Sequence, residues 1–193
     1  MVAPHKNFGQ VKWLETGYRH FAEYGPEKLS INKLSKELNS SRASFYHYFG
    51  DIDVFIDELR AMHWGIALEF NKRGRSECKQ FFPDLYVLLA EHPVPLKFSI
   101  QLFRHRNTPA YNYLFLKTYE SSAKSFILKL FKKKYKLDQP ENELLKLWLT
   151  VGETWYSRLT LEDLSAITLQ ENAEEILDTV VRFAGSQLYE QFK

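Results

Sequence analysis

Apolar residues recur along this chain three and four positions apart, the spacing that places them on one face of an α-helix. No run of β-branched residues alternates with polar ones between hairpin turns, as half-buried strands would require. The sequence also contains no internal repeat and no low-complexity tract. The pattern therefore predicts an all-α protein of about nine helices.

Three short helices are predicted at the N-terminus. The first runs from about residue 11 to Tyr24 and stops at Gly25-Pro26, a pair that terminates helices. The second begins after a cap at Ser30, and the third begins after a cap at Ser41. Their inward positions are Leu14, Gly17, Tyr18 and Phe21 in the first helix, Ile31, Leu34 and Leu38 in the second, and Phe45, Tyr48 and Phe49 in the third.

A longer fourth helix is predicted to start at a cap on Asp51 and to fade between residues 72 and 76. Its apolar face carries Phe55, Leu59, Met62 and Ile66. Further helices are expected from about residue 77 to 91, 94 to 106, 109 to 135, 141 to 159 and 169 to 191, separated in part by Pro93, Pro95 and Pro109.

The last two helices are apolar over an unusually wide arc. A helix that is apolar over more than about a third of its circumference is buried on two sides. One side would face the core of this chain, and the other would face a second copy. The residues predicted for this dimer interface are Trp148, Val151, Gly152, Trp155, Val180, Val181, Ala184 and Leu188.

The second and third helices have the dimensions of a DNA-binding helix-turn-helix. A helix that enters a DNA groove needs short side chains for close approach and hydrogen-bond donors for bases and phosphates. On the third helix, the outward positions hold Arg42, Ala43, Ser44, Tyr46 and His47, which meet this need. The alternative is an ordinary amphipathic helix with a solvated polar face, but an exposed Tyr46 beside His47 is an unusual choice for a face that binds nothing.

From Trp13 to Leu59 the chain resembles the DNA-binding domain of the TetR family of bacterial transcription repressors. In this family the first helix ends in a phenylalanine and a glycine, as at Phe21 and Gly25, and the second begins with Ser or Thr, as at Ser30. The recognition helix runs Ser, two variable or small residues, Ser or Thr, an apolar residue, Tyr, a variable residue, His or Tyr, and Phe. Residues 41–49 fit this pattern at every position.

The resemblance implies which residues contact DNA. Those expected at bases or nearby phosphates are Ser41, Arg42, Ala43, Ser44 and His47, with the Tyr46 hydroxyl at the DNA backbone and Ser30, Asn32 and Lys33 at the edge of the groove.

Four positions depart from the family pattern. Asn39-Ser40 replaces the usual Gly-Val of the turn, which removes a buried apolar side chain, although Asn tolerates the left-handed conformation that the turn needs. Ser35 replaces an Ala, and Ile52 replaces a Lys near the start of the fourth helix. Losing that lysine predicts a salt dependence of DNA binding that is shallower by about one unit of slope.

Composition excludes several classes of protein. The single cysteine, Cys78, cannot pair within the chain, no stretch approaches the roughly 18 apolar residues of a membrane span, and the first ten residues lack the apolar core of a signal peptide. A cytoplasmic protein without a membrane partner is therefore expected. The six histidines are scattered, and neither a phosphate-binding loop nor a nucleophile motif occurs, so we expect no metal, no cofactor and no enzymatic activity.

The net charge of +2 is close to neutral, but its distribution is uneven. Residues 1–50 carry seven basic and four acidic side chains, a modest basic bias. Six lysines lie between residues 124 and 136 with no acidic residue among them. They would suit a nucleic acid or an acidic membrane surface, but cations at the C-terminal end of a helix are also favoured by the helix dipole.

The resemblance implies a dimeric repressor with a helix-turn-helix DNA-binding domain over residues 1–52 and a helical effector-binding and dimerisation domain over residues 53–193. Its partners would be a palindromic double-stranded operator, a second copy of the chain and an unknown small-molecule effector. Residues suited to an effector pocket are Phe82, Tyr86, Phe98, Phe103, Arg104, Tyr111, Phe115, Tyr119 and Trp148, and plain core packing is the alternative for each. The alternative functions are an architectural or division-associated DNA-binding protein without a ligand, or a helical protein whose helix-turn-helix is vestigial.

Overall fold

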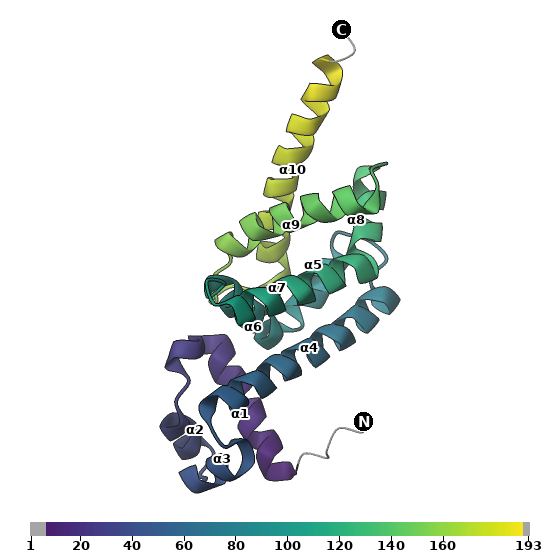
Figure 1. Cartoon of the computed structure of the whole chain (residues 1–193). Helices are drawn as coiled ribbons and strands as arrows, with labels where there is room; N and C mark the ends of the chain where they lie inside the picture. The colour runs from purple at the N-terminus through teal and green to yellow at the C-terminus, as the bar shows by residue number, and fades with distance from the viewer. Residues whose placement is uncertain (1–6, 191–193) are drawn as a thin grey trace. The chain divides into compact units, whose positions relative to one another are not determined.

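The computed structural model describes the backbone of residues 7–190 and the side chains of residues 7–180 (Figure 1). Every regular element in that range is helical, which confirms the predicted all-α class. The helices are α1 (Phe8–Tyr24), α2 (Ile31–Glu37), α3 (Arg42–Phe49), α4 (Ile52–Glu77), α5 (Asp84–Ala90), α6 (Pro93–Arg104), α7 (Pro109–Ser122), α8 (Leu128–Tyr135), α9 (Glu141–Arg158) and α10 (Ala166–Glu190). A π-helical turn (Ala123–Ile127) joins α7 to α8, and a 3-10 turn (Pro26–Lys28) follows α1.

The predicted helix boundaries agree with the structure to within a few residues, except before α5 and over residues 109–135, where one predicted helix is divided by a π-helical turn into α7 and α8. The sequence predicts a helix from about residue 77, but α5 begins at Asp84, so the first half of that prediction is wrong. The segment before α5 is a turn, in which the Asp84 carboxylate accepts hydrogen bonds from the backbone N–H groups of Lys79 and Gln80 at 2.7 and 2.9 Å. Pro83 occupies the cap of α5 and has no N–H, so the helix cannot extend backwards through it.

The described chain divides into two compact units. The first contains the chain up to Ala67 together with Val94–Phe115 and therefore holds α1, α2, α3, most of α4, nearly all of α6 and the first half of α7. The second contains Leu68–Pro93 and the chain from Leu116 onward.

Aromatic side chains build the core of the first unit. Phe98 on α6 is wholly buried and lies between the rings of Phe21 and Tyr18 on α1, with centroid distances of 4.1 and 4.5 Å. Phe45 on α3 is also wholly buried, with its ring 5.2 Å from that of Trp13. The inward face predicted for the first helix is confirmed, because each of its four residues is buried.

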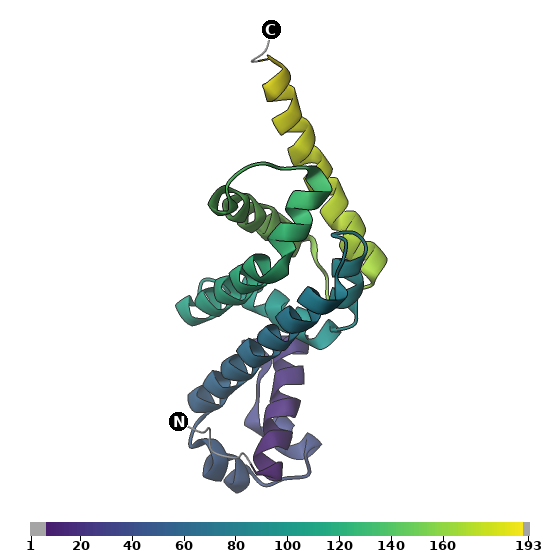
Figure 2. The ribbon, with the colours of Figure 1, turned by 90° about the vertical axis from the view of Figure 1, so that its right-hand side faces the viewer.

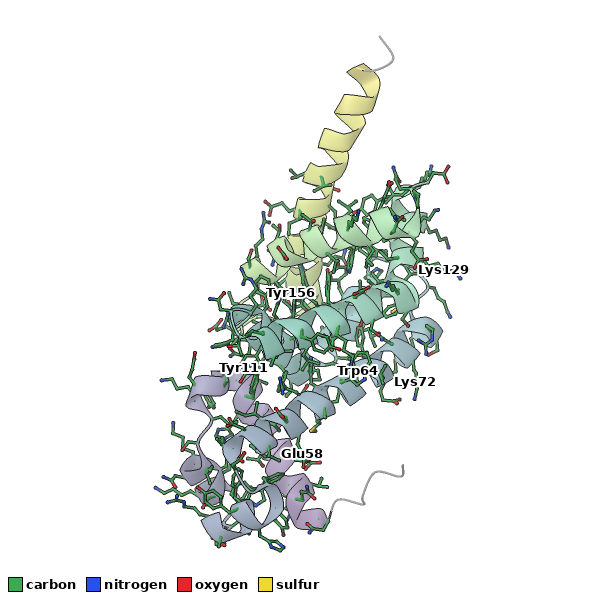
Figure 3. All side chains as sticks on the ribbon, in the orientation of Figure 1. Glu58, Trp64, Lys72, Tyr111, Lys129 and Tyr156 are labelled. Carbon is green, nitrogen blue, oxygen red and sulfur yellow. The ribbon has the colours of Figure 1, made fainter. Side chains whose placement is uncertain are left out.

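In the second unit α10 packs against α5 and α9, and α9 also packs against α8. Tyr156 marks α9 in Figure 3. Figures 1 and 2 both show the C-terminal part of α10 projecting past the other helices of this unit. Over the described residues, no helix has an apolar stretch long enough to cross a bilayer.

Candidate nucleic-acid interface

The helix-turn-helix consists of α2, a tight turn and α3. Asn39 in the turn has a φ of 48°, the left-handed conformation expected for it. At the far end of α3, Gly50 has a φ of 73° and ends the helix, and Asp51 then caps α4 by accepting the backbone N–H of Val54 at 2.8 Å. These two features confirm the predicted limits of the recognition helix.

Ser35 stabilises the turn by hydrogen bonds, whereas the family pattern would bury an apolar side chain in the turn at position 40. Its hydroxyl donates to the carbonyl oxygen of Ser40 at 2.7 Å, and the N–H of Ser40 donates to the carbonyl oxygen of Ser35 at 3.0 Å. Two departures from the family pattern, Ser35 and Ser40, are therefore partners in one pair of hydrogen bonds. An alanine at position 35 could not form the first of these bonds.

We expect the Ser35→Ala substitution to lower the free energy of unfolding by about 1 kcal/mol, because one partly buried hydrogen bond is lost. Ser76→Ala is the matched control, since the Ser76 hydroxyl donates only to carbonyl groups of its own helix. Urea unfolding of both variants and the wild type measures the difference. Equal free energies for the two variants would show that the turn does not depend on Ser35.

The start of α3 is capped by Ser41. Its hydroxyl oxygen accepts the backbone N–H of Ser44 at 3.2 Å, while the Ser44 hydroxyl donates to the carbonyl oxygen of Ser41 at 2.6 Å. The predicted cap at Ser41 is thus confirmed. Ser30 stands at the corresponding position before α2, but its side chain makes no capping hydrogen bond, so that part of the prediction is wrong. Its place is set by backbone bonds such as that from Leu34 N–H to its carbonyl oxygen, at 3.0 Å.

The inner face of α3 is fixed by rings. Phe45 and Phe49 are buried, and both pack against the wholly buried Phe55 of α4, with centroid distances of 5.2 and 4.7 Å. Close packing of this kind leaves α3 little freedom to rotate about its axis. The outer face of α3 is therefore held in a defined orientation.

The outer face is polar and accessible. Arg42, Ala43 and His47 are exposed, and Tyr46 is 44% exposed. Ser41 is exposed and Ser44 is partly buried. On the N-terminal side of the turn, Asn32 and Lys33 are exposed and Ser30 is partly buried. The structure thus presents to solvent most of the residues that the sequence assigns to DNA.

Residues of α6 and the position after it contact the C-terminal end of α1 and the turn that follows, through hydrogen bonds and ion pairs that the sequence does not predict. Gln101 Nε2 donates to the carbonyl oxygen of Ala22 at 3.3 Å, and Lys97 Nζ lies 2.7 Å from Glu23 Oε2. His105 Nε2 lies 3.1 Å from Glu27 Oε2, just beyond the helix end. The partners are more than 70 positions apart in the sequence, so no local signal could have identified them.

A buried polar network connects α1, α4 and α6. The Tyr18 hydroxyl and His63 Nδ1 are 2.7 Å apart, and Ser99 Oγ lies 3.2 Å from His63 Nε2. The imidazole of His63 also stacks on Phe98 at 4.5 Å. Burial lowers the pKa of His63 from 6.5 to about 3 and raises the pKa of Tyr18 above its usual range. Both groups are therefore neutral near pH 7.

The residues predicted for an effector pocket divide between the two units. Phe98, Phe103, Arg104, Tyr111 and Phe115 lie in the first unit, and Phe82, Tyr86, Tyr119 and Trp148 lie in the second. The stacking partners of Phe98 are enough to account for its burial, in keeping with the core-packing alternative. In the second unit, Phe82 lies in the turn before α5, Tyr86 on α5, Tyr119 on α7 and Trp148 on α9. The Phe82 ring stacks on Tyr86 at 5.2 Å, and the Tyr119 ring stacks on Trp148 at 5.8 Å.

Four residues of the predicted dimer interface, Trp148, Val151, Gly152 and Trp155, are buried within the single chain. A Cβ added to Gly152 would lie 2.1 Å from Tyr119 Oη, so this glycine makes room for a ring of its own chain. Val180 is partly buried. The remaining members, Val181, Ala184 and Leu188, lie outside the residues whose side chains the structure describes. The interface therefore stays a prediction.

A surface pocket of about 200 Å³ lies beside α5 in the second unit, lined by Glu77, Cys78, Asp84, Val87, Leu88 and Glu91. Arg73 bridges Glu77 and Glu91 at 2.6 and 2.8 Å, and its hydrogen bond holds the pKa of Glu77 below its usual range. Burial raises the pKa of Cys78 to about 11, which leaves a protonated, unreactive thiol. No cluster of metal-ligating side chains occurs among residues 7–180.

Comparison with known proteins bears on the helix-turn-helix first. Residues 14–59 match the family model described as "Bacterial regulatory proteins, tetR family". The chain is also similar in fold to a candidate transcriptional regulator from Saccharomonospora viridis, solved in complex with choline, with a TM-score of 0.65, 15% sequence identity, and coverage of 87% of this chain and 94% of that chain.

A weaker similarity, with a TM-score of 0.46 and 19% identity over 91% of this chain and 88% of that chain, relates it to Mycobacterium smegmatis AmtR. No curated protein sequence matches the chain. The family match spans α2 and α3 with the helices on either side of them, which are the elements that build the polar face described above.

Proposed function

Because the chain belongs to the TetR family of bacterial DNA-binding transcriptional regulators, we propose that it is a homodimeric repressor that a small-molecule effector releases from a palindromic operator. The observation that carries the proposal is the outer face of α3. Its side chains are exposed while the opposite face is locked by Phe45 and Phe49 against Phe55. A rigid helix with free hydrogen-bond donors is what a major-groove probe requires.

Within this proposal each face residue has a role. Arg42 reads a base edge or holds a phosphate, Ala43 allows close approach, and Tyr46 donates its hydroxyl to the DNA backbone. His47 and the capping pair Ser41 and Ser44 complete the α3 contacts. Ser30, Asn32 and Lys33 contact the edge of the groove.

Two copies would place two recognition helices about 34 Å apart, one turn of DNA. The leucines Leu145, Leu147 and Leu149 on α9 are only partly buried, so each retains apolar surface that a second copy can cover. The projecting part of α10 has no other helix of the second unit beside it in either view (Figures 1 and 2). Both features favour dimerisation through α9 and α10, with effector binding and dimerisation assigned to residues 53–193 and DNA binding to residues 1–52.

Effector control requires that the ligand prefer one separation of the two recognition helices over the other, with a coupling of typically about 1–3 kcal/mol. Choline, a cation, tests whether the site accepts a charged ligand, since the Saccharomonospora viridis protein of similar fold was solved with choline. If choline neither dissociates the operator complex nor raises the melting temperature, choline is not the effector.

Selection of bound sequences from a random double-stranded DNA pool tests the repressor proposal. We expect a palindromic consensus with half-sites one helical turn apart. Arg42→Ala should weaken binding to that consensus by about tenfold to a hundredfold, the range for a lost base-specific contact. Lys129→Ala is the matched control, because it removes the same charge from an exposed position on α8 in the second unit.

Fluorescence anisotropy at fixed salt gives both affinities. The proposal fails if no sequence is enriched or if Arg42→Ala and Lys129→Ala bind equally well.

A further inference from the structure

Six aromatic side chains form a closed circuit of ring contacts inside the second unit. Each ring centroid lies 5.2 to 6.2 Å from the next. In order around the circuit they are Phe81, Tyr86, Trp155, Tyr156, Tyr119 and Trp148. They come from α5 and the turn before it, α7 and α9.

Trp148 has a polar atom that the protein leaves unsatisfied. Its side chain is 5% exposed, and its Nε1–H has no hydrogen-bond partner in the described chain. Trp155, in the same circuit, instead donates its Nε1–H to the carbonyl oxygen of Leu169 at 3.0 Å. A buried N–H without an acceptor carries an uncompensated desolvation penalty, which an acceptor supplied by a ligand would relieve.

The position of the Trp148 indole is well defined. The Tyr119 ring lies parallel to it within 7°, and the Tyr119 hydroxyl donates to the carbonyl oxygen of Trp148 at 3.3 Å. Gly152, one turn further along α9, leaves the space that the Tyr119 hydroxyl occupies. The position of the unsatisfied Trp148 N–H is therefore fixed, because residues of helices and not of a loop hold the indole ring.

The surroundings select the charge of the ligand. Five of the six contacts in the circuit involve rings inclined by 69° to 86°, so in these pairs the ring edges and faces already satisfy one another's electrostatic preference. Among the described residues of the second unit, the buried polar side chains are Asn71 and Thr118, and none is charged. An ion would find no buried charged side chain in this interior to offset its desolvation.

We propose that Trp148 Nε1 is the hydrogen-bond donor of the effector site, and that the effector is an uncharged, flat molecule with one accepting oxygen, as in an aromatic amide or ketone. This inference rests on the proposed function, because it names the ligand class for the regulator described above. The ligand packs among the rings of the circuit and accepts the Trp148 N–H.

Isothermal titration of the full chain with the uncharged carbonyl compounds benzamide, acetophenone and coumarin tests the ligand class, with benzylamine and benzoate as the charged counterparts. We expect at least one uncharged compound to bind and both charged ones to fail. In the wild type, the indole N–H resonance of Trp148 should shift on binding, while that of Trp155 should move less.

Trp148→Phe keeps a ring but removes the donor, so it should weaken binding by about tenfold. Its melting temperature without ligand should equal or exceed that of Trp155→Phe, which loses a satisfied hydrogen bond. A structural role for Trp148 alone would lower stability and leave affinity unchanged. The inference is overturned if no uncharged compound binds, if the charged compounds bind as well, or if the Trp148 resonance does not respond.

Operator binding, measured without ligand, separates the two proposals. If operator selection and Arg42→Ala behave as expected while every carbonyl compound fails, the repressor proposal stands and the ligand assignment is wrong. If a carbonyl compound binds through Trp148 but no operator is selected, the binding site stands and the repressor proposal is wrong.

Discussion

Replacing Gly17 by alanine should lower the free energy of unfolding by about 2–3 kcal/mol and the melting temperature by about 5–10 °C. A Cβ at this position would lie 2.2 Å from Cζ and 2.7 Å from Cε1 of Phe55, far inside van der Waals contact. Phe55 is wholly buried and is held by Phe45 and Phe49, so its ring has no space to withdraw. The added methyl group must therefore separate α1 from α4.

Gly65→Ala is the matched control for this prediction. Gly65 is also a helical glycine, but a Cβ added there meets no atom within 4 Å. This control should stabilise the protein by about 0.5–1 kcal/mol through helix propensity alone. Because α1, α4 and α3 meet at Phe55, Gly17→Ala should also weaken operator binding, which Gly65→Ala should not. Thermal unfolding measures the stability of both variants, and fluorescence anisotropy measures their operator binding. Equal stabilities would refute the packing argument.

Local patterns predict the recognition helix well because each of its features depends on neighbours in the sequence. The cap at Ser41, the left-handed Asn39 and the break at Gly50 are set within a few residues. The same reasoning fails before α5, where a helical apolar pattern is overridden by Pro83 and by the hydrogen bonds of Asp84.

Contacts between distant residues could not be predicted in this way. Ser35 is read from the sequence as a departure from the family pattern, and only its 2.7 Å hydrogen bond to Ser40 shows that the two departures compensate each other. His63 is read as one of several scattered histidines, although it is buried between Tyr18 and Ser99, 45 and 36 positions away. A wide apolar arc on a helix is produced equally by packing in the core of the chain and by packing against a second copy. The arc of α9 therefore agrees with both arrangements.

The burial of His63 should make the protein sensitive to acid between about pH 6.5 and pH 3. Above pH 6.5 the imidazole is neutral in the folded and unfolded states, and His63 adds no pH dependence. Below pH 6.5 the unfolded chain takes up a proton that the folded chain, with a His63 pKa of about 3, does not. Stability is then lost by about 1.4 kcal/mol per pH unit, or about 2 kcal/mol at pH 5.

His63→Gln should remove this loss. The amide can still hydrogen-bond to the Tyr18 hydroxyl or to Ser99 but cannot be protonated in this range. We expect the variant to be less stable than the wild type at pH 7, because the ring stack on Phe98 is lost, and to lose about 2 kcal/mol less between pH 7 and pH 5. All other titrating groups are common to both proteins, so the difference between their urea unfolding curves isolates His63. Parallel pH profiles would mean that the folded protein admits the proton.

Because the network joins α1, α4 and α6 within the unit that carries the recognition helix, the same acid range should weaken operator binding of the wild type more than that of His63→Gln.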